Sequence, residues 1–257
     1  MDVPVLVERR DSVLSITMAR PERRNAITVA MYAALADAIE GAASDRSIRL
    51  ITLEGQGDDF TAGNDLGDFL QAMPRPGDAQ DIPVWRLLRA LAKNQVPIIA
   101  AVHGNAVGIG TTMLFHCDFV LAEEGSRFVM PFVDLGLVPE AASSLLLPRL
   151  AGRRRAARYL LLGEPFGVDE AMGFGLASHA VPKDQLKTAL DGLVAALLAK
   201  PPEALRQTQA LLRRVDTQEV LDRMELENGH FAERLQSEEV KQAIAAFFAA
   251  RAKAPAA

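Results

Sequence analysis

Residues 96–110 read VPIIAAVHGNAVGIG, an apolar run followed at once by a glycine-rich segment. The run Val96–Val102 has the near-continuous apolar character of a strand that is covered on both faces, as in a parallel sheet. Three glycines follow, where backbone can approach closely, and we expect the next helix to begin near Ile109. The stretch therefore predicts a strand, a tight loop and a helix, which is the repeating unit of an α/β fold.

The same unit is found upstream of this stretch. Alternating apolar residues predict a strand over Val13–Met18, and Ile48–Leu53 predicts a second one. Between them, apolar residues recur at helical spacing over Met31–Ile39, with Thr28 placed as the helix cap. A further helix around Trp85–Leu91 leads into the strand described above. Strand, helix and strand in this order predict parallel crossovers.

The C-terminal part of the sequence has a different pattern. From about Lys183 the strand signals end, while helical periodicity continues to Phe248. The pair Pro201-Pro202 separates two of these helices, because proline fits the first turn of a helix and breaks its interior. Their apolar faces are too large for the segment to bury alone, so we expect packing against the core or another subunit. We predict a core over 1–195 and a helical region over 196–257.

Composition narrows the classes of function. The chain has 257 residues with 49% hydrophobic residues, enough for one large domain. A net charge of −5 gives no general attraction to nucleic acid or anionic membranes. The longest apolar runs are far shorter than the ~20 residues that span a bilayer. A single cysteine, Cys117, and no basic-then-apolar leader predict a cytoplasmic protein. Met73–Pro83, with three prolines, predicts a loop.

Several common catalytic motifs are missing. The four histidines and the cysteine lack zinc-ligand spacing, so no metal site is expected. The segment GNAVGIG over 104–110 fits neither a dinucleotide-binding nor a phosphate-binding loop. No G-x-S-x-G elbow exposes a serine nucleophile.

Two loop-to-helix junctions are the strongest candidates for a site. Asp59–Leu66 (DFTAGNDL) and His103–Gly110 (HGNAVGIG) each follow a predicted strand and lead into a helix whose first N–H groups have no partner. Two such N–H groups pointing at one place make an oxyanion hole. Alternatively, the glycines only allow tight packing of helices on strands.

Three segments taken together resemble one family. RPERRNA at 20–26, FTAGNDL at 60–66 and VPIIAAVHGNAVGIG at 96–110 resemble R-P-x-x-x-N-A, F-x-A-G-x-D-L and K-P-V-I-A-A-V-x-G-x-A-x-G-G-G of the enoyl-CoA hydratase/isomerase (crotonase) superfamily. The resemblance implies an α/β spiral of repeated ββα units, a C-terminal helical region that assembles trimers, and an acyl-CoA thioester. It also implies an oxyanion hole formed by the N–H groups of Ala62 and Ile109, where Ile109 replaces the usual glycine.

The acid and base groups decide the reaction within this superfamily. Hydratases carry two glutamates, and their positions here hold Thr112 and Phe132, neither of which is a base near neutral pH. MPFVDLGLVPEAASS at 130–144 resembles the P-F-x-x-L-G-x-x-P-E-G-x-S-S stretch of peroxisomal-type Δ3,Δ2-enoyl-CoA isomerases, whose glutamate is the base. By this resemblance Glu140 is the base, and Asp134 is a lower-ranked competitor.

Two features qualify the assignment of Glu140. Ala141 replaces the glycine that follows the glutamate in the family, so the local turn can differ. Glu140 also follows Pro139 and precedes a helix-prone segment, where an acidic residue suits the helix dipole without any catalytic role.

Weaker resemblances concern coenzyme A. The residues that we predict to contact substrate or coenzyme A are Arg23, Arg24, Ala26, Asp65, Leu66, Phe132, Arg251 and Lys253. For Arg23 and Arg24, simple surface solvation is an equal alternative. The cluster Arg153–Arg155 is left without a role.

The sequence thus predicts a Δ3,Δ2-enoyl-CoA isomerase of fatty acid metabolism, β-oxidation included, that forms homo-oligomers (trimers or hexamers). Coenzyme A is part of the substrate, and no further cofactor is expected. Two alternatives stay open: an enoyl-CoA hydratase or another CoA-thioester lyase or hydrolase, and a non-catalytic acyl-CoA-binding subunit.

Overall fold

The computed structural model describes residues 4–71, 82–214 and 217–253. Its central element is a six-stranded sheet in the order β1-β2-β3-β4-β6-β9. The β1–β2 pair is antiparallel and every other pair in this sheet is parallel. The strands are β1 Val5–Arg10, β2 Val13–Met18, β3 Leu50–Gly55, β4 Ile98–Val102, β6 Phe119–Glu123 and β9 His179–Val181.

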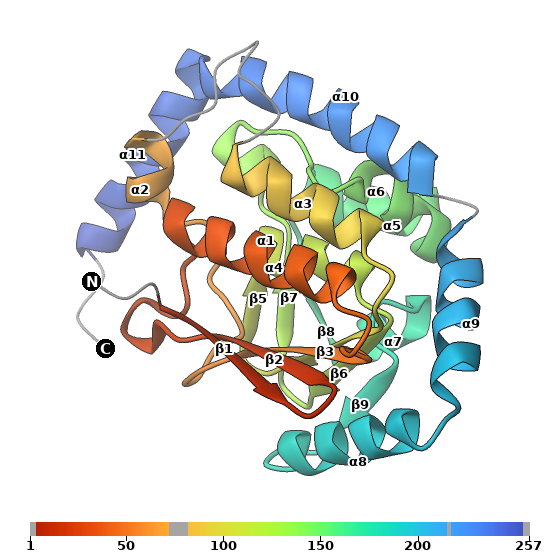
Figure 1. The fold of residues 1–257 in the computed structure, drawn as a ribbon. Coiled ribbons are helices and arrows are strands. Elements are labelled where there is room, and N and C mark those ends of the chain that lie inside the picture. Colours follow the sequence, from red (N-terminus) through yellow and green to blue (C-terminus); the bar gives the residue numbers. More distant parts are fainter. Residues whose placement is uncertain (1–3, 72–81, 215–216, 254–257) are drawn as a thin grey trace.

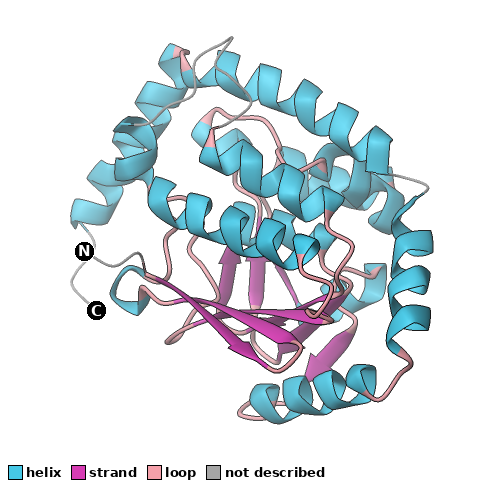
Figure 2. Cartoon of the chain, viewed as in Figure 1, coloured by secondary structure: helices cyan, strands magenta, loops and turns pink. Residues whose placement is uncertain are grey.

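A second sheet has three short strands in the order β5-β7-β8. They are β5 Asn105–Val107, β7 Arg127–Val129 and β8 Phe166–Gly167. Because β5 follows β4 after a two-residue turn, the chain leaves the large sheet and enters the small one within residues 103–105. Figure 2 shows both sheets gathered at the centre with helices around them.

Helices cover both faces of the large sheet (Figure 1). Helices α1 (Val29–Ser44) and α3 (Pro83–Lys93) pack on one face, and their buried side chains belong to the main hydrophobic cluster. Helix α8 (Leu186–Leu198) covers the other face, where Leu190 and Leu197 pack with Leu50, Ile99 and Leu121. This two-sided burial explains the continuous apolar pattern of β4.

The remaining helices are short helices of the core or belong to the C-terminal region. They are α2 Leu66–Gln71, α4 Ile109–Thr112, α5 Ser143–Ala151, α6 Arg153–Leu161, α7 Val168–Phe174, α9 Pro202–Arg214, α10 Thr217–Leu235 and α11 Glu238–Lys253. The described residues also form the 3₁₀ turns η1 Pro21–Arg23, η2 Met113–His116 and η3 Val133–Leu135. No helix in the described part of the chain is long and apolar enough to cross a membrane.

The main expectations about secondary structure are confirmed. Thr28 caps α1, accepting the Met31 N–H at 3.2 Å, and α4 begins at Ile109. The strand-helix-strand crossover is parallel, and among the residues described after β9 the elements are all helices. Of the loop predicted over Met73–Pro83, residues 73–81 lie outside the described part of the chain, and Pro83 is the first residue of α3.

The C-terminal helices pack on the core of the same chain. Val220, Met224, Phe231 and Leu235 of α10 and Val240 and Ile244 of α11 belong to the same hydrophobic cluster as the sheet and α1. Figure 1 shows α10 passing over α3. The boundary between 1–195 and 196–257 stays a prediction.

Candidate active site

Asn25 holds the loop at 59–66 in place from the end of η1. Its side chain is fully buried, and its backbone has a left-handed φ of 55°. The amide Nδ2 donates to the carbonyls of Gln56 and Asp59, both at 2.8 Å, while Oδ1 accepts the Arg20 N–H at 2.8 Å. The asparagine of the RPERRNA segment therefore has a structural role: it satisfies backbone groups of two segments at once.

Asp59 joins this loop to the glycine-rich loop after β4. Its carboxylate accepts Arg24 Nε at 2.5 Å and the Asn105 N–H at 2.8 Å. Burial alone raises the pKa of Asp59, but the hydrogen bonds from Arg24 and Asn105 outweigh it and lower the pKa below its ordinary value. The two candidate loops thus share one ionised, buried carboxylate.

The two loops also touch backbone to backbone, as the glycines suggested. A Cβ atom at Gly104 would lie 2.0 Å from the carbonyl oxygen of Asp58. At Gly63, whose φ is +83°, a Cβ atom would lie 2.7 Å from the carbonyl oxygen of Val107. Side chains at these two positions would separate the loops, so glycine is required for this close approach.

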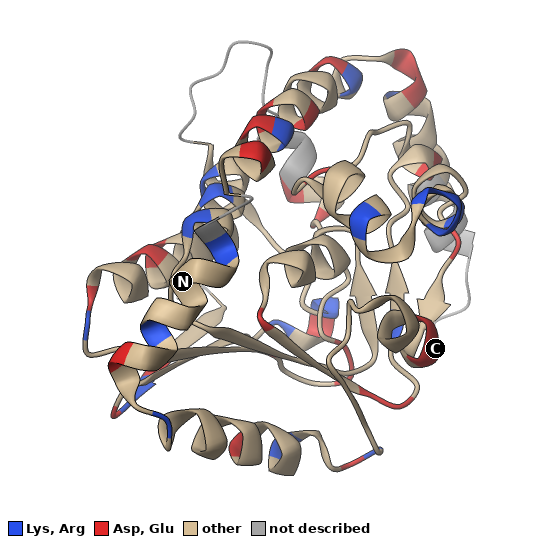
Figure 3. Cartoon of the chain, turned by 90° about the vertical axis from the view of Figure 1, so that its right-hand side faces the viewer, with Lys and Arg blue, Asp and Glu red and all other residues tan. Residues whose placement is uncertain are grey.

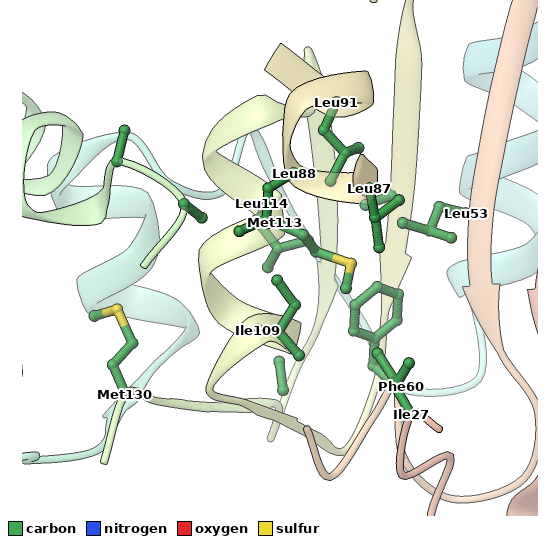
Figure 4. Packing of buried hydrophobic residues seen from close by; sticks show 14 of the residues in the cluster. Ile27, Leu53, Phe60, Leu87, Leu88, Leu91, Ile109, Met113, Leu114 and Met130 are labelled. Atoms are coloured by element: carbon green, nitrogen blue, oxygen red, sulfur yellow. The ribbon is translucent and has the colours of Figure 1, made fainter. Parts of the chain in front are cut away.

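Ile109 presents a backbone donor at the start of α4. As the first residue of the helix, it has no intrahelical acceptor for its N–H. Its side chain is 1% exposed and lies in the apolar cluster beside Met113, facing Phe60 (Figure 4). The isoleucine therefore fits where most family members have glycine, because the core takes up the side chain. The predicted role of its N–H is compatible with this geometry.

Ala62 does not fit the role that the sequence suggested. Its N–H already donates to the carbonyl of Arg24 at 2.8 Å, so it is used within the protein. The N–H of Asn64, two residues later, is not used in this way. It donates to no atom of residues 4–71, 82–214 or 217–253. Ile27 pairs with the residues on both sides of Asn64, at 2.8 and 2.9 Å, and so fixes this strand-like stretch. The structure thus points to Asn64, in place of Ala62, as the free donor of this loop.

Tyr32 of α1 reaches the same loop and was not identified from the sequence. Its phenol is buried and donates to Oδ1 of Asn64. Burial, and in second place the charge of Glu140, raise the pKa of Tyr32 well above its ordinary value. Tyr32 therefore connects the loop at 59–66 with the surroundings of Glu140. A polar aromatic residue on the buried face of a helix was the available signal.

Glu140 is a buried carboxyl group with an unsatisfied oxygen. It is 4% exposed, and within the described residues its Oε1 has no hydrogen-bond partner. Burial, and next the negative charge of Glu227, raise the pKa of Glu140 to about 8. A buried carboxyl group that no structural bond occupies is the usual form of a catalytic acid or base.

The structural alternative for Glu140 does not hold. The N-cap of α5 is Ala142, so Glu140 lies outside the first helical turn. The carboxylate that accepts the N–H groups at this helix start belongs to Glu227 of α10. The competitor Asp134 lies exposed on η3, and its Oδ2 would lie 2.5 Å from a Cβ atom placed at Gly163.

The positions of the hydratase glutamates are filled without a carboxylate. Thr112 is fully buried in α4, and among the described residues its Oγ1 has no hydrogen-bond partner. Phe132 is 5% exposed and belongs to the apolar cluster together with Leu137. Neither position therefore supplies a carboxylate, and one of them carries a buried hydroxyl without a described partner. The described residues hold no cluster of His, Cys, Asp and Glu able to bind a metal ion.

The residues predicted to bind coenzyme A are spread over several elements. Arg23 is exposed, and Arg24 is bound to Asp59. Asp65 is paired with Arg20 at 2.7 Å. The Asp65 side chain also caps α2, which begins at Leu66. The half-buried Ala26 accepts Arg20 Nη1 through its carbonyl oxygen. Arg251 and Lys253 lie at the end of α11, and their side chains are outside the described part. Their contacts with coenzyme A stay predictions.

Residues with charges of both signs are spread over the outer helices (Figure 3). The cluster Arg153–Arg155 lies exposed in the first turn of α6 and lines an open surface hollow with Arg158. Arg158 itself is paired with Glu164 at 2.8 Å.

Comparisons with known proteins show which family this chain resembles. The profile of the enoyl-CoA hydratase/isomerase family matches residues 8–254. The chain is 32% identical to the 1,2-epoxyphenylacetyl-CoA isomerase of Escherichia coli (strain K12), covering 96% of each protein. It is 30% identical to the peroxisomal enoyl-CoA delta isomerase 3 of Mus musculus, covering 97% of this chain and 80% of that protein. The crystal structure of an enoyl-CoA hydratase/isomerase from Pseudoalteromonas atlantica T6c superposes with a TM-score of 0.89 at 40% identity, covering 99% of each chain.

Proposed function

The chain belongs to the enoyl-CoA hydratase/isomerase family and has the α/β crotonase fold, and within that family we propose that it is a Δ3,Δ2-enoyl-CoA isomerase. The observation that carries the proposal is Glu140, a buried carboxyl group with one oxygen free of any bond to the described residues and a pKa raised to about 8. The mouse relative, named an enoyl-CoA delta isomerase, supports the same reaction.

In the proposed reaction Glu140 removes a proton from C2 of a 3-enoyl-CoA. The electrons move into a dienolate, whose oxygen accepts the free N–H groups of Ile109 and Asn64. Glu140 then returns the proton at C4, and the double bond lies between C2 and C3. These two proton transfers change no oxidation state, so the side chains and backbone donors named here supply all of the chemistry of the reaction.

One carboxyl group suffices for this reaction, whereas hydration requires a water to be activated and a proton to be delivered to carbon. Thr112 and Phe132 leave the two hydratase positions without a carboxylate. A raised pKa suits a residue that must both accept and return a proton near neutral pH. The arrangement therefore favours proton transfer over hydration.

A second candidate function is hydration, which one observation favours. The Thr112 hydroxyl is buried and has no partner among the described residues, so it is able to hold a water beside the site. In this alternative Glu140 would activate that water for addition to C3 of a 2-enoyl-CoA. Activity with crotonyl-CoA distinguishes this reaction from the isomerisation.

The first experiment compares two substrates with the purified protein. 3-Hexenoyl-CoA is followed to 2-hexenoyl-CoA by chromatography, and crotonyl-CoA is followed to 3-hydroxybutyryl-CoA. We expect isomerisation with negligible hydration. Fast hydration would establish the second candidate, and tight binding of hexanoyl-CoA with neither reaction would show a non-catalytic acyl-CoA-binding subunit.

We further propose that the chain forms trimers or pairs of trimers. The support is a set of exposed leucines on α6, after α6 and on α9, which a single chain leaves in contact with water: Leu161 at 66%, Leu162 at 63%, Leu211 at 66% and Leu212 at 72% exposure. Light scattering coupled to size-exclusion chromatography measures the mass. A monomer at micromolar concentration would contradict this assembly.

A further inference from the structure

Glu227 is a buried carboxylate of α10 that the proposed chemistry does not use. It is 5% exposed and lies far from Glu140 in sequence. Its Oε2 accepts the Ala142 N–H at 2.6 Å, and its Oε1 accepts the Ser144 N–H at 3.0 Å. Both donors belong to the start of α5, directly after Glu140. Helix α10 thus contacts the backbone that carries the base.

The turn after Glu140 has a strained backbone. Ala141 and Ala142 have φ values of 60° and 56°, the left-handed region that residues other than glycine rarely adopt. Both are completely buried. Such a conformation persists only where neighbouring groups hold it, and here Glu227 binds the N–H of Ala142 while His116 Nε2 contacts the carbonyl oxygen of Ala141 at 2.8 Å.

Further bonds join the turn to Glu140 itself. Ser143 Oγ donates to the Glu140 carbonyl at 2.6 Å, and the Ser143 N–H donates to the same oxygen at 3.0 Å. The backbone of Glu140 is therefore part of the unit that Glu227 fixes. The direction of the Glu140 side chain depends on this unit, because Cα and Cβ follow the backbone.

Charged and titratable groups from three elements face Glu140 and Glu227. Tyr32 comes from α1 and is neutral because burial, and in second place the charge of Glu140, raise its pKa. His116 comes from η2 and is neutral because burial lowers its pKa to about 4. Arg223 of α10 attracts Glu227 and donates to Ser144 Oγ at 3.2 Å. Glu227 thus has two N–H donors and a cation, whereas Glu140 has an oxygen without a described partner.

These surroundings separate the roles of the two carboxyl groups. Burial raises the pKa of Glu227 above its ordinary value, and its hydrogen bonds and the charge of Arg223 offset part of that rise. Two backbone donors and a cation stabilise its charged form, so Glu227 holds the negative charge first. That charge repels a second one on Glu140, which therefore keeps its proton to higher pH.

We propose that Glu227 is a positioning residue for the reaction, because it holds the Ala141–Ala142 turn that aims Glu140 and places a fixed negative charge beside that base. The inference rests on Glu140 as the base of the proposed function. The proposal extends the active site to α10, a C-terminal helix that carries none of the site residues predicted from the sequence. Packing of α10 on the core then controls both the direction and the protonation of Glu140.

The experiment measures kcat and KM against pH for wild type and Glu227→Gln, with 3-hexenoyl-CoA as substrate. A carboxamide offers one acceptor oxygen for two N–H donors and removes the charge. We expect kcat on the pH plateau to fall about tenfold or more with KM within about threefold, and the acid limb to move down by about one pH unit. The matched control is Glu225→Gln, because Glu225 is an exposed residue of the same helix. We expect this variant to leave kcat, KM and the acid limb unchanged.

A second variant separates charge from geometry. Glu227→Asp keeps the charge but shortens its reach by one methylene, so we expect a lower kcat with the acid limb near its wild-type position. A Glu227→Gln enzyme with wild-type kcat and an unmoved acid limb would overturn the proposal. If Glu227→Gln does not fold, a Glu227→Asp enzyme with wild-type kcat overturns it equally.

A readout without turnover keeps this inference apart from the proposed function. The protonation of Glu140 is followed by carboxyl carbon NMR in wild type and Glu227→Gln, with Glu140→Gln used to assign the signal. A downward shift of the Glu140 titration supports the inference even if 3-hexenoyl-CoA is not converted, and that result would refute only the isomerase activity. An unshifted titration refutes the charge effect of Glu227, whatever the enzyme does.

Discussion

The Glu227 carboxylate accepts the Ala142 N–H at 2.6 Å, so helix α5 is capped from α10 and not by Glu140. The consequence is a division of labour between two acidic residues around one turn. Glu227 accepts the backbone N–H groups at the start of the helix. In a purely structural role, Glu140 would accept these N–H groups instead. Glu140 is left with a free oxygen among the described residues and is available for proton transfer.

The pH dependence of the reaction follows from the raised pKa of Glu140. A base must be ionised in the free enzyme, and the Glu140 pKa of about 8 places that ionisation above neutrality. We expect kcat/KM for isomerisation to rise with pH along an acid limb of apparent pKa about 8. A pH series from 5 to 10 measures it. A limb near the ordinary glutamate value of 4.5 would contradict the buried state of this carboxyl group.

The raised pKa of Glu140 should also make the stability of the protein depend on pH. The folded protein holds the Glu140 proton up to about pH 8, whereas the unfolded chain releases it near 4.5, so this group lowers the free energy of unfolding as pH rises between these values. Glu140→Gln removes the titration. We expect its stability to equal that of wild type near pH 4.5 and to exceed it at pH 8 by an amount on the order of a few kcal/mol. Urea unfolding at both pH values tests this, and a difference that does not change with pH would contradict it.

The contact between the two loops is tested by one glycine substitution. Gly104→Ala places a Cβ atom 2.0 Å from the Asp58 carbonyl oxygen at a φ of +57°, and we expect a loss of about 3 kcal/mol or more. Gly41→Ala is the control, because nothing lies within 4 Å of its Cβ position in α1 and alanine favours a helix by about 0.5–1 kcal/mol. Thermal unfolding of both variants gives the comparison. Equal melting temperatures would show that the loops do not pack as described.

Removal of the Tyr32 hydroxyl tests the link between α1 and the loop at 59–66. Tyr32→Phe leaves Oδ1 of Asn64 without its buried donor, and we expect a loss of about 1–3 kcal/mol of stability. Because Asn64 also offers a free backbone N–H, kcat should fall while KM changes little. Steady-state kinetics and urea unfolding measure the two effects. A variant with wild-type kcat would show that the Asn64 donor does not depend on Tyr32.

The fold was largely predictable because the apolar pattern of each element reflects which faces are buried. The run at 96–102 is continuous because α8 and the helices of the opposite face cover β4, and Thr28 caps α1 as its position indicated. Such signals are local, and one window of sequence contains them. The division of the strands into two sheets is not local, and no pattern indicated it.

The candidate site depends more on contacts between remote segments, so less of it could be predicted. Motifs indicate Glu140 and Ile109, whose catalytic roles stay predictions. Ala62 has no free N–H to offer, because the Arg24 carbonyl, from a distant segment, accepts it. Glu227 was missed because its partners, Ala142 and Ser144, are far away in sequence. Roles that depend on contacts between remote segments leave no mark in the spacing of residues.

The central claim is that Glu140 is the single base of an enoyl-CoA isomerase. The most direct test is turnover of 3-hexenoyl-CoA by Glu140→Gln beside the control Asp134→Asn, with hexanoyl-CoA affinity measured by calorimetry for both. The account predicts that Glu140→Gln binds hexanoyl-CoA as wild type does and loses turnover by a factor of about 10³ or more, while Asp134→Asn keeps both. Wild-type turnover by Glu140→Gln would contradict it.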